Sequence, residues 1–126
     1  MAKYVDGFVL VVPKGKEAEY EEMTRMGRDA WMKHGALQYF ECRGDDLAPQ
    51  ALGPDKMRQF SEMAGANDQE NVWFSFIVFE SKAHRDEVNQ KVMAEMDESY
   101  SDQVDFQMPN DMTKMAYGGF TAVVEG

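Results

Sequence analysis

The sequence has 126 residues and a mass of 14.4 kDa, with 44% apolar and 29% charged residues, which is typical of one globular domain and not of a disordered chain. The net charge is −10, from 23 acidic and 13 basic residues, whereas phosphate backbones and anionic lipids are bound by clustered Lys and Arg. We therefore expect a single domain over residues 1–126, with no nucleic-acid partner and no membrane surface.

The first half of the sequence alternates between strand and helix patterns. Residues 4–12 are rich in β-branched and aromatic side chains and predict a strand that Pro13 ends. Residues 14–34 place apolar side chains three or four positions apart and predict an amphipathic helix, with Gly35 where a left-handed cap belongs. Residues 36–43 predict a second strand, followed by a Gly-Asp-Asp turn.

A long connection precedes the strongest strand pattern. Residues 47–71 contain two prolines and two glycines and predict an irregular connection, in which residues 55–63 form a short helix or an edge strand. Residues 72–80 are almost continuously apolar and predict the third strand. Ser81 is a suitable N-cap for a helix over residues 82–96.

The end of the sequence predicts one docked segment and one strand. Residues 97–114 are acidic with isolated apolar side chains, a pattern that favours a segment docked on the body of the protein. Residues 115–125 predict the last strand, with Gly118 and Gly119 at a bulge or a close backbone approach. The order β-α-β, then β-α-β, predicts an α+β ferredoxin-like fold, an antiparallel four-stranded sheet with two helices on one face.

The third predicted strand is apolar on both of its faces. Because side chains alternate along a strand, one face carries Val72, Phe74, Phe76 and Val78, and the other carries Trp73, Ile77 and Phe79. Helices would cover one face only, and soluble monomers rarely leave a large apolar patch bare. We therefore expect a second copy of the chain to cover the other face, giving a homodimer, since twofold dimers are the commonest soluble oligomers.

The single cysteine and the first residues bear on the cellular compartment. Cys42 has no partner for an intramolecular disulfide, which is typical of a reducing compartment. Only Lys3 precedes the first short apolar run, and Asp6 and Gly7 interrupt that run, so it lacks the pattern of a secretory signal. No stretch approaches the roughly 20 apolar residues of a membrane span. We expect a cytoplasmic protein.

Four runs of sequence carry a resemblance to known proteins. They are YVDGFVLVVPK, GALQYFECRGDD, FSFIVFESKAHRDEVNQKVMAEM and KMAYGGFTAVV. Together they resemble a bacterial YbaA-like family of unknown function. The resemblance implies a dimeric α/β barrel of ferredoxin-like subunits, a group that includes small monooxygenases, haem-degrading proteins, isomerases and stress-response proteins. It implies no settled activity and carries over no catalytic residue.

Three polar residues share one face of the second predicted strand. Tyr39, Glu41 and Arg43 lie two positions apart, so a phenol, a carboxylate and a guanidinium stand in a row that could hold a small polar ligand. A cross-strand salt-bridge ladder or a dimer contact is the alternative interpretation.

Asp6 and His84 are the candidates for acid–base catalysis. Asp6 lies within an apolar strand, where a carboxyl group can have a raised pKa, unless it pairs with an Arg or a backbone amide across the sheet. His84 begins an apolar stripe of the second predicted helix, which continues at four-residue spacing through Val88, Val92 and Met96. There His84 can act as a base toward the interior or be a satisfied core histidine. The sequence assigns no catalytic role to either residue.

No pattern of metal or cofactor ligands occurs in the sequence. His34 and His84 stand alone, Cys42 has no Cys or His at ligand spacing, and there is no phosphate loop or dinucleotide glycine pattern. The eleven methionines are scattered, which favours core filling over a pocket or a metal path. We expect no metal and no cofactor.

Three functions remain open from the sequence. The first is a homodimeric α/β-barrel protein that binds a small organic molecule. The second is a cofactor-independent small enzyme of the oxygenase or isomerase type, by analogy of fold. The third is a non-catalytic structural or regulatory interaction module. An enclosed pocket containing Asp6, His84 or the row that begins at Tyr39 would favour an enzyme.

Overall fold

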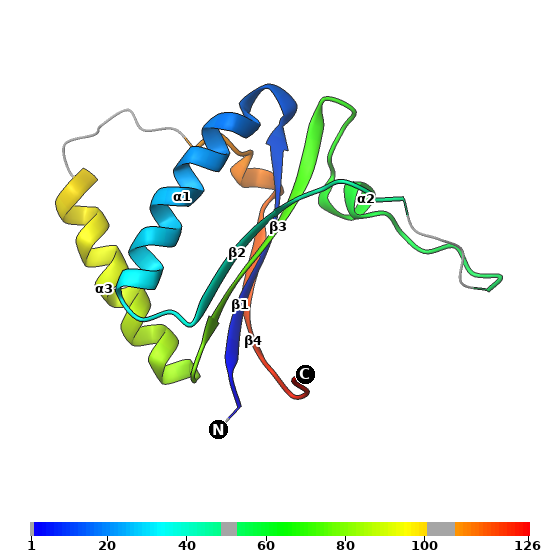
Figure 1. Cartoon of the computed structure of the whole chain (residues 1–126). Coiled ribbons are helices and arrows are strands. Elements are labelled where there is room, and N and C mark those ends of the chain that lie inside the picture. Colours follow the sequence, from blue (N-terminus) through cyan, green and yellow to red (C-terminus); the bar gives the residue numbers. More distant parts are fainter. Residues whose placement is uncertain (1, 49–52, 101–107) are drawn as a thin grey trace.

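A four-stranded antiparallel sheet with two long helices on one face forms the framework of the chain (Figure 1). The computed structural model describes residues 2–48, 53–100 and 108–126, with the backbone alone at 99 and 100. The strands are β1 (Tyr4–Pro13), β2 (Gln38–Arg43), β3 (Glu70–Phe79) and β4 (Ala116–Thr121). The helices are α1 (Glu17–Lys33), α2 (Phe60–Ala64) and α3 (Lys82–Tyr100), with the 3₁₀ turns η1 (Lys14–Lys16) and η2 (Met112–Lys114).

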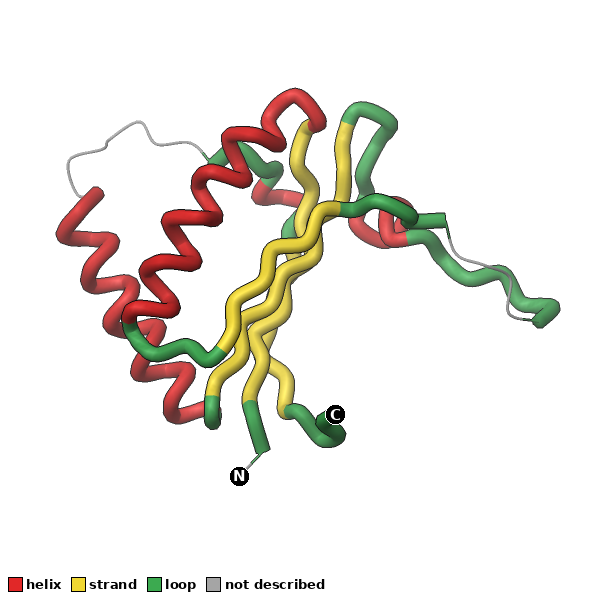
Figure 2. Tube along the Cα trace, in the orientation of Figure 1, coloured by secondary structure: helices red, strands yellow, loops and turns green. Residues whose placement is uncertain are grey.

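The strand order is β2-β3-β1-β4, and every neighbouring pair is antiparallel. The two most apolar strands, β1 and β3, lie at the centre and pair from Tyr4 opposite Phe79 to Pro13 opposite Glu70. The helices α1 and α3 lie on the same side of the sheet (Figure 2). The α+β class, the antiparallel sheet and the predicted β-α-β-β-α-β order of strands and long helices are confirmed.

Several predicted boundaries are wrong by a few residues. β3 begins at Glu70, before the predicted start at residue 72, because Glu70 pairs with Pro13 at the end of the long β1 ladder. α3 continues to Tyr100, since the helix goes on after its apolar stripe stops at Met96. The short helix of the long connection is Phe60–Ala64, later than the predicted 55–63.

Gly118 and Gly119 lie in β4 without a bulge. β4 pairs with β1 in continuous register through all of its residues. A side chain at Gly119 would collide with the Tyr4 ring, whereas the space beside Gly118 is open. Of the two predicted alternatives, the close approach is therefore confirmed at Gly119 and the bulge is wrong.

The core lies between the sheet and the two long helices. Its fully buried side chains include Leu10 and Val12 on β1, Phe79 on β3, and Val88 and Val92 on α3. Removing each such side chain from water contributes about 1.5–3 kcal/mol. The two valines are part of the predicted apolar stripe, so the helical period of the sequence correctly identified the face of α3 that packs on the sheet.

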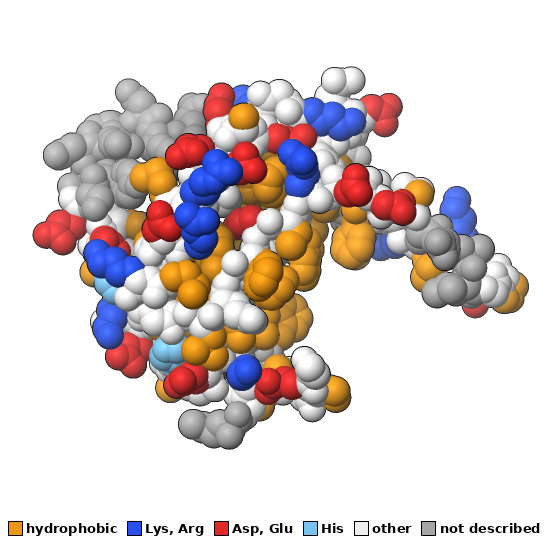
Figure 3. Space-filling view, in the orientation of Figure 1, with side chains coloured by type: hydrophobic (Ala, Val, Ile, Leu, Met, Phe, Trp, Pro, Cys, Tyr) orange, Lys and Arg blue, Asp and Glu red, His pale blue; other side chains and the backbone are white. Residues whose placement is uncertain are grey.

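The opposite face of the sheet is apolar and exposed. Phe40, Phe74 and Phe120 are 46%, 45% and 61% exposed, and the Phe40 ring stacks on Phe76 with ring centroids 4.9 Å apart. Residues 53–66, which include α2, project from the body, and we call them the arm (Figure 1). Figure 3 shows hydrophobic side chains along the side of the body that faces this arm. We call the surface formed by Phe40, Phe74, Phe76 and Phe120 the open sheet face.

The segment that the sequence predicts to dock, residues 97–114, divides into three parts. Residues 97–100 belong to α3, and residues 101–107 lie outside the described residues. Residues 108–114 do dock: the Asp111 amide donates a hydrogen bond to the Val11 carbonyl at 3.0 Å, and Asn110 is buried. This described part lies beside β1 and contributes to the helix side of the sheet.

A buried ion pair joins α3 to β1. The Asp6 carboxylate accepts a hydrogen bond from the Arg85 guanidinium at 2.7 Å, and the two side chains are 4% and 17% exposed. The guanidinium also lies over the Tyr4 ring, 4.9 Å from its centroid. Burial raises the pKa of Asp6, and the positive charge of Arg85 counteracts that rise. Asp6 therefore has the arginine partner that the sequence left as an alternative.

Replacement of Arg85 by Met is expected to lower the free energy of unfolding by about 3 kcal/mol, because Asp6 would stay buried without a counter-charge. Lys91→Met on the same helix is the matched control, since an exposed pair such as Lys91–Glu87 contributes at most about 1 kcal/mol. Urea unfolding followed by circular dichroism measures both changes. An Arg85→Met variant as stable as the control would contradict a stabilising role for the pair.

Candidate functional site

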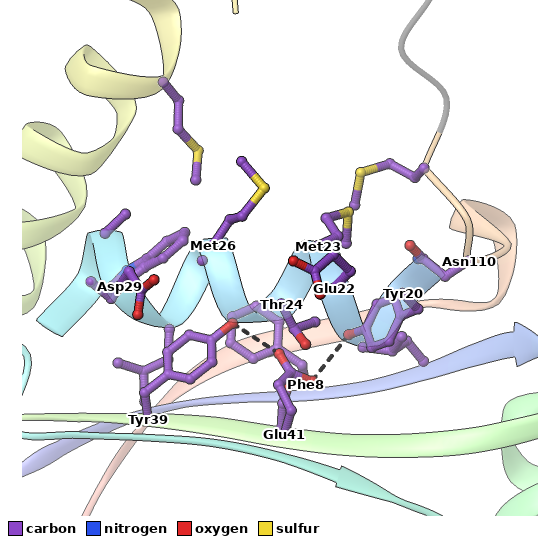
Figure 4. Close-up of a pocket in the computed structure, with 18 of the residues that line it drawn as sticks. Phe8, Tyr20, Glu22, Met23, Thr24, Met26, Asp29, Tyr39, Glu41 and Asn110 are labelled. Carbon is purple, nitrogen blue, oxygen red and sulfur yellow. Dashed lines mark hydrogen bonds between the residues drawn. The ribbon is translucent and has the colours of Figure 1, made fainter. Parts of the chain in front are cut away.

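A cleft opens between the sheet and the helices that cover it, and we call it the helix–sheet cleft. Its volume is about 1330 Å³, enough for an organic molecule of drug size. Figure 4 shows Tyr39 and Glu41 rising from β2 toward α1, which contributes Tyr20. Most of the surrounding surface is apolar, with a few polar groups among aromatic and methionine side chains.

The Glu41 carboxylate is the polar centre of the helix–sheet cleft. One of its oxygens accepts a hydrogen bond from the Tyr20 hydroxyl at 3.1 Å, and the other accepts one from the Tyr39 hydroxyl at 3.0 Å (Figure 4). Ser75, buried on β3, provides a further side-chain hydrogen bond. Three elements, α1, β2 and β3, therefore converge on one carboxylate.

A glycine on α1 makes this convergence possible. Tyr39 and Glu41 point toward α1 together because side chains two positions apart in a strand share a face. Gly27 is buried next to the Tyr39 ring, and a β-carbon at this position would lie 3.0 Å from the Tyr39 hydroxyl. That separation is tighter than ordinary contact. Glycine therefore lets the hydroxyl lie against the helix while it still reaches Glu41.

Burial dominates the electrostatics around Glu41. Loss of water raises the pKa of the Glu41 carboxyl, and the hydrogen bonds from Tyr39, Tyr20 and Ser75 counteract part of the rise. Burial, together with the neighbouring carboxylate, raises the pKa of both tyrosines well above the usual range. Both hydroxyls therefore stay protonated at neutral pH and act as donors to the carboxylate.

Methionines form much of the remaining lining. Five of them contribute from α1, α3 and the C-terminal segment: Met23, Met26, Met96, Met108 and Met115. The predicted core filling is confirmed for Met23, Met96 and Met115, which pack against the core clusters. The same three also line the cleft with Met26 and Met108, so the five are gathered around one space and not scattered. Thioether side chains are flexible and polarisable, so the lining can adapt to molecules of different shape.

Asn110 lies in the lining, at the end of the cleft near Tyr20 (Figure 4). The residue is 6% exposed, and its Oδ1 atom has no hydrogen-bond partner among the residues that the structure describes. Its Nδ2 group contacts the sulfur of Met112 at 3.4 Å. A buried acceptor without a donor costs about 1–3 kcal/mol, and this oxygen is enclosed at the edge of the cleft.

Arg43 does not join Tyr39 and Glu41. It is exposed at the end of β2, where it lines a smaller hollow together with Cys42 and Phe60. Within the described ranges, no hydrogen bond or ion pair links Arg43 to Glu41. The structure thus brings together two of the three residues that the strand period grouped.

His84 lies at the start of α3, outside the helix–sheet cleft. Its Nδ1 atom accepts a hydrogen bond from the Glu80 amide at 3.0 Å, and its own amide donates to the Ser81 hydroxyl at 3.1 Å, which confirms the predicted N-cap. The ring packs edge-on against Phe79 at 6.0 Å between centroids. Asp6 also lies outside the cleft lining, so neither acid–base candidate faces this space.

The sequence did not single out Tyr20, Ser75 or Asn110. Tyr20 belongs to the apolar face of the predicted first helix, and a buried tyrosine hydroxyl usually finds a hydrogen-bond partner; that was an available signal. Ser75 interrupts an otherwise apolar strand, which was another. Asn110 carried no local signal, because its burial depends on how the segment docks.

Two further properties concern the described residues as a whole. Across residues 2–48, 53–100 and 108–126, no group of three or more His, Cys, Asp or Glu side chains is arranged to hold a metal ion. In the same ranges, no helix has the length and apolar character needed to cross a membrane.

Comparison with known proteins places the chain among proteins without an assigned activity. The family model described as "Protein of unknown function (DUF1428)" matches residues 3–112. The uncharacterized protein YbaA of Escherichia coli K12 is 36% identical over 124 residues, which cover 98% of each chain, and YbaA of Shigella flexneri matches equally. The crystal structure of the NE2512 protein of unknown function from Nitrosomonas europaea aligns with a TM-score of 0.52 at 12% identity, over 100% of this chain and 94% of that one, which shows a likeness of fold alone.

The raised pKa of Glu41 predicts a stability penalty that grows with pH. A carboxyl group with a higher pKa in the folded state favours folding when protonated, so its contribution falls as pH rises from the ordinary value of 4.5 through the folded value. Glu41→Gln removes this titration, and we expect its melting temperature to gain on that of the wild type between pH 4.5 and neutral pH. Calorimetry at both pH values measures the difference.

Glu87→Gln, exposed on α3, controls for the loss of one negative charge. Asp6 titrates alike in all three proteins, so its own raised pKa cancels from the comparison. A melting temperature of Glu41→Gln that falls relative to that of the wild type as pH rises would mean that the ionised carboxylate stabilises the fold, contrary to this prediction.

Proposed function

Because the chain belongs to the family of proteins of unknown function described as DUF1428, we propose a function from its own geometry: a homodimeric, ferredoxin-like α/β-barrel protein that binds a small organic molecule in the helix–sheet cleft. The observation that carries the proposal is the Glu41 carboxylate, held by Tyr20 and Tyr39 within an apolar cleft. Ligand sites combine an apolar lining with a few fixed polar groups, and this cleft has that composition.

The cleft also supports binding over a purely structural role. A structural or regulatory module needs no cleft of this size between its helices and its sheet. Here the cleft of about 1330 Å³ contains the partly buried Glu41 carboxylate, and the unpaired amide oxygen of Asn110 lies at its edge. Desolvation of the Glu41 carboxylate costs free energy in the empty protein, and a bound molecule that donates a hydrogen bond to it would recover part of that cost.

The homodimer is proposed from the open sheet face. Phe40, Phe74 and Phe120 keep about half of their surface in water, and burying that half contributes about 1 kcal/mol for each side chain. Two subunits supply six such rings, and Phe76 and neighbouring valines add to them. The six rings together contribute about 6 kcal/mol, which is comparable with the lower part of the range of about 4–15 kcal/mol that association costs, so the face supplies a large share of what a dimer contact needs.

The arm that carries α2 supports the same assembly. Figure 1 shows this segment extending away from the sheet, so that the arm and the open sheet face border one recess. Its apolar side chains Met57 and Phe60 are 41% and 46% exposed. A second subunit in the recess would cover both the arm and the sheet face, and twofold symmetry would give each subunit the same two contacts.

A second candidate function, a cofactor-independent enzyme of the isomerase type, rests on the same carboxyl group. A raised pKa suits a residue that takes up or releases a proton near neutral pH. Tyr20 and Tyr39 fix the orientation of Glu41, as an acid–base group requires. Chemical turnover of a bound molecule that Glu41→Gln abolishes without loss of binding would favour the enzyme over the binding protein.

Native mass spectrometry of the purified protein tests the binding function. We expect the wild type to carry a small molecule that is released on denaturation, and we expect Met23→Trp to lose it because the larger ring fills the helix–sheet cleft. Met32→Trp is the matched control, since Met32 is on the same helix, 43% exposed and outside the cleft lining. Equal occupancy in both variants would contradict binding at this cleft.

Sedimentation velocity at micromolar concentration tests the dimer. Phe74→Asp is expected to convert the wild-type dimer into monomer, because the new carboxylate would be buried without a partner in the contact. Met93→Asp on α3 makes the same kind of change at a similarly exposed site away from the sheet and should remain dimeric. A wild-type chain that sediments as a 14.4 kDa monomer would contradict the proposed assembly.

A further inference from the structure

The negative charge on Glu41 has no cationic partner in the described part of the chain. Its hydrogen bonds come from the hydroxyl groups of Tyr20, Tyr39 and Ser75, which are all neutral. Neutral donors stabilise an ionised carboxylate but leave its net charge in place. Carboxylates removed from water in proteins are usually paired with a cation or coordinate a metal ion. The partly buried Glu41 carboxylate has no such cation among the described residues.

Basic side chains around the cleft are engaged elsewhere. Lys33, which lines the cleft, pairs with Glu95 at 2.8 Å. Arg28, whose charge acts on Tyr39, pairs at the surface with its neighbour Asp29 at 3.0 Å. Neither pair includes Glu41. The missing counter-charge therefore has to come from outside the described residues.

Acidic side chains predominate around the opening. In addition to Glu41, the lining includes Glu19, Glu22, Asp29, Glu95 and Asp97, and one basic residue, Lys33. Three of these acids are paired at the surface, Glu22 with Arg25, Asp29 with Arg28 and Glu95 with Lys33. A cleft with low-dielectric walls and charges of one sign concentrates ions of the opposite sign. The three carboxylates without an ion pair in the described part of the chain, Glu19, Glu41 and Asp97, therefore favour a cation over an anion in this cleft.

Several hydrogen-bond donors that line the cleft are already bonded within the protein. The Thr24 hydroxyl donates to the Glu21 carbonyl at 2.8 Å, and the Trp31 indole donates to Asn89 at 3.0 Å. The two tyrosine hydroxyls donate to Glu41. The donors are therefore committed, while the buried Asn110 Oδ1 remains an acceptor without a partner in the described residues.

We infer that the ligand of the helix–sheet cleft is an organic cation with an apolar body, in its simplest form an alkyl or aryl ammonium. Its ammonium group donates hydrogen bonds to Glu41, and its apolar part lies against the methionine side chains and Trp31. Aromatic faces around the carboxylate add cation–π attraction. This inference rests on the proposed binding function and narrows it to one class of ligand.

Three probes that share a phenyl ring and differ in the charge of the head group test the inference. They are phenethylamine, phenethyl alcohol and phenylpropanoate. Titrations of isotope-labelled wild-type protein, followed by NMR at the amides of Gly27 and Ser75, give the three affinities. We expect the amine to bind about tenfold more tightly than the alcohol, because its hydrogen bond to the carboxylate is charge-assisted, and we expect the carboxylate probe to bind most weakly.

Glu41→Gln connects the selectivity to one side chain. It should weaken binding of phenethylamine about tenfold and leave phenethyl alcohol unchanged, since the amide keeps the shape of the carboxyl group without its charge. Glu87→Gln removes the same charge at an exposed site on α3 and should change neither affinity. The comparison of probes on the wild type stands even if a variant folds poorly.

Separate outcomes bear on the inference and on the proposed function. Equal affinities for the amine and the alcohol in the wild type, with shifts at Gly27 and Ser75, would overturn the cationic ligand and leave the binding function intact. No shift at either amide with all three probes at millimolar concentration would overturn both. Retention of the amine preference in Glu41→Gln would overturn the assignment to this carboxylate.

Discussion

Alternation along β3 places large apolar side chains on both faces of one thin sheet, and each face needs its own cover. Trp73, Ile77 and Phe79 lie beneath α1 and α3, where they build the core. Phe74 and Phe76 lie on the open sheet face. The chain therefore has its cleft on one side of the sheet and its proposed subunit contact on the other. A ligand can bind without competing with assembly, because the two surfaces share a sheet but no side chains.

On the helix side, α1 and α3 do not cover the sheet completely. The polar side chains of Glu41, Tyr20 and Tyr39 lie where the helices leave the cleft open. The helices meet the sheet closely at Val88 and Val92 but leave space around Glu41. Desolvating a carboxylate there works against folding, as the raised pKa of Glu41 indicates. Tyr20 and Tyr39 limit that cost without removing the charge. Local arrangements that lower stability without a structural benefit are characteristic of functional sites.

The fold was largely predictable from the sequence because its signals are local. The periods of β3 and α3 identified the strand, the helix and its packing face, and Ser81 marked the start of α3. The site was predictable only where strand geometry governs it, as in the shared face of Tyr39 and Glu41. Contacts between distant segments could not be predicted from local patterns. The partner of Asp6, for example, is Arg85, which lies 79 residues further along the sequence. The methionines of the cleft come together only after folding, and Arg43, at the end of β2, lines a different hollow from Tyr39 and Glu41.

The helix α1 is fastened at both of its ends. At its first residue, the Glu17 carboxylate accepts hydrogen bonds from the Trp73 indole at 2.9 Å and from Asn71 at 3.1 Å, both on β3. At its other end, the last residue Lys33 and the following His34 both contact the Glu95 carboxylate of α3, at 2.8 and 2.7 Å. Because both ends of α1 are fixed by hydrogen bonds or ion pairs, the helix that carries Tyr20 is held against tilting. For the binding function proposed above, such a helix would lose little conformational entropy on binding, and rotation of the methionine side chains would accommodate ligands of different shape.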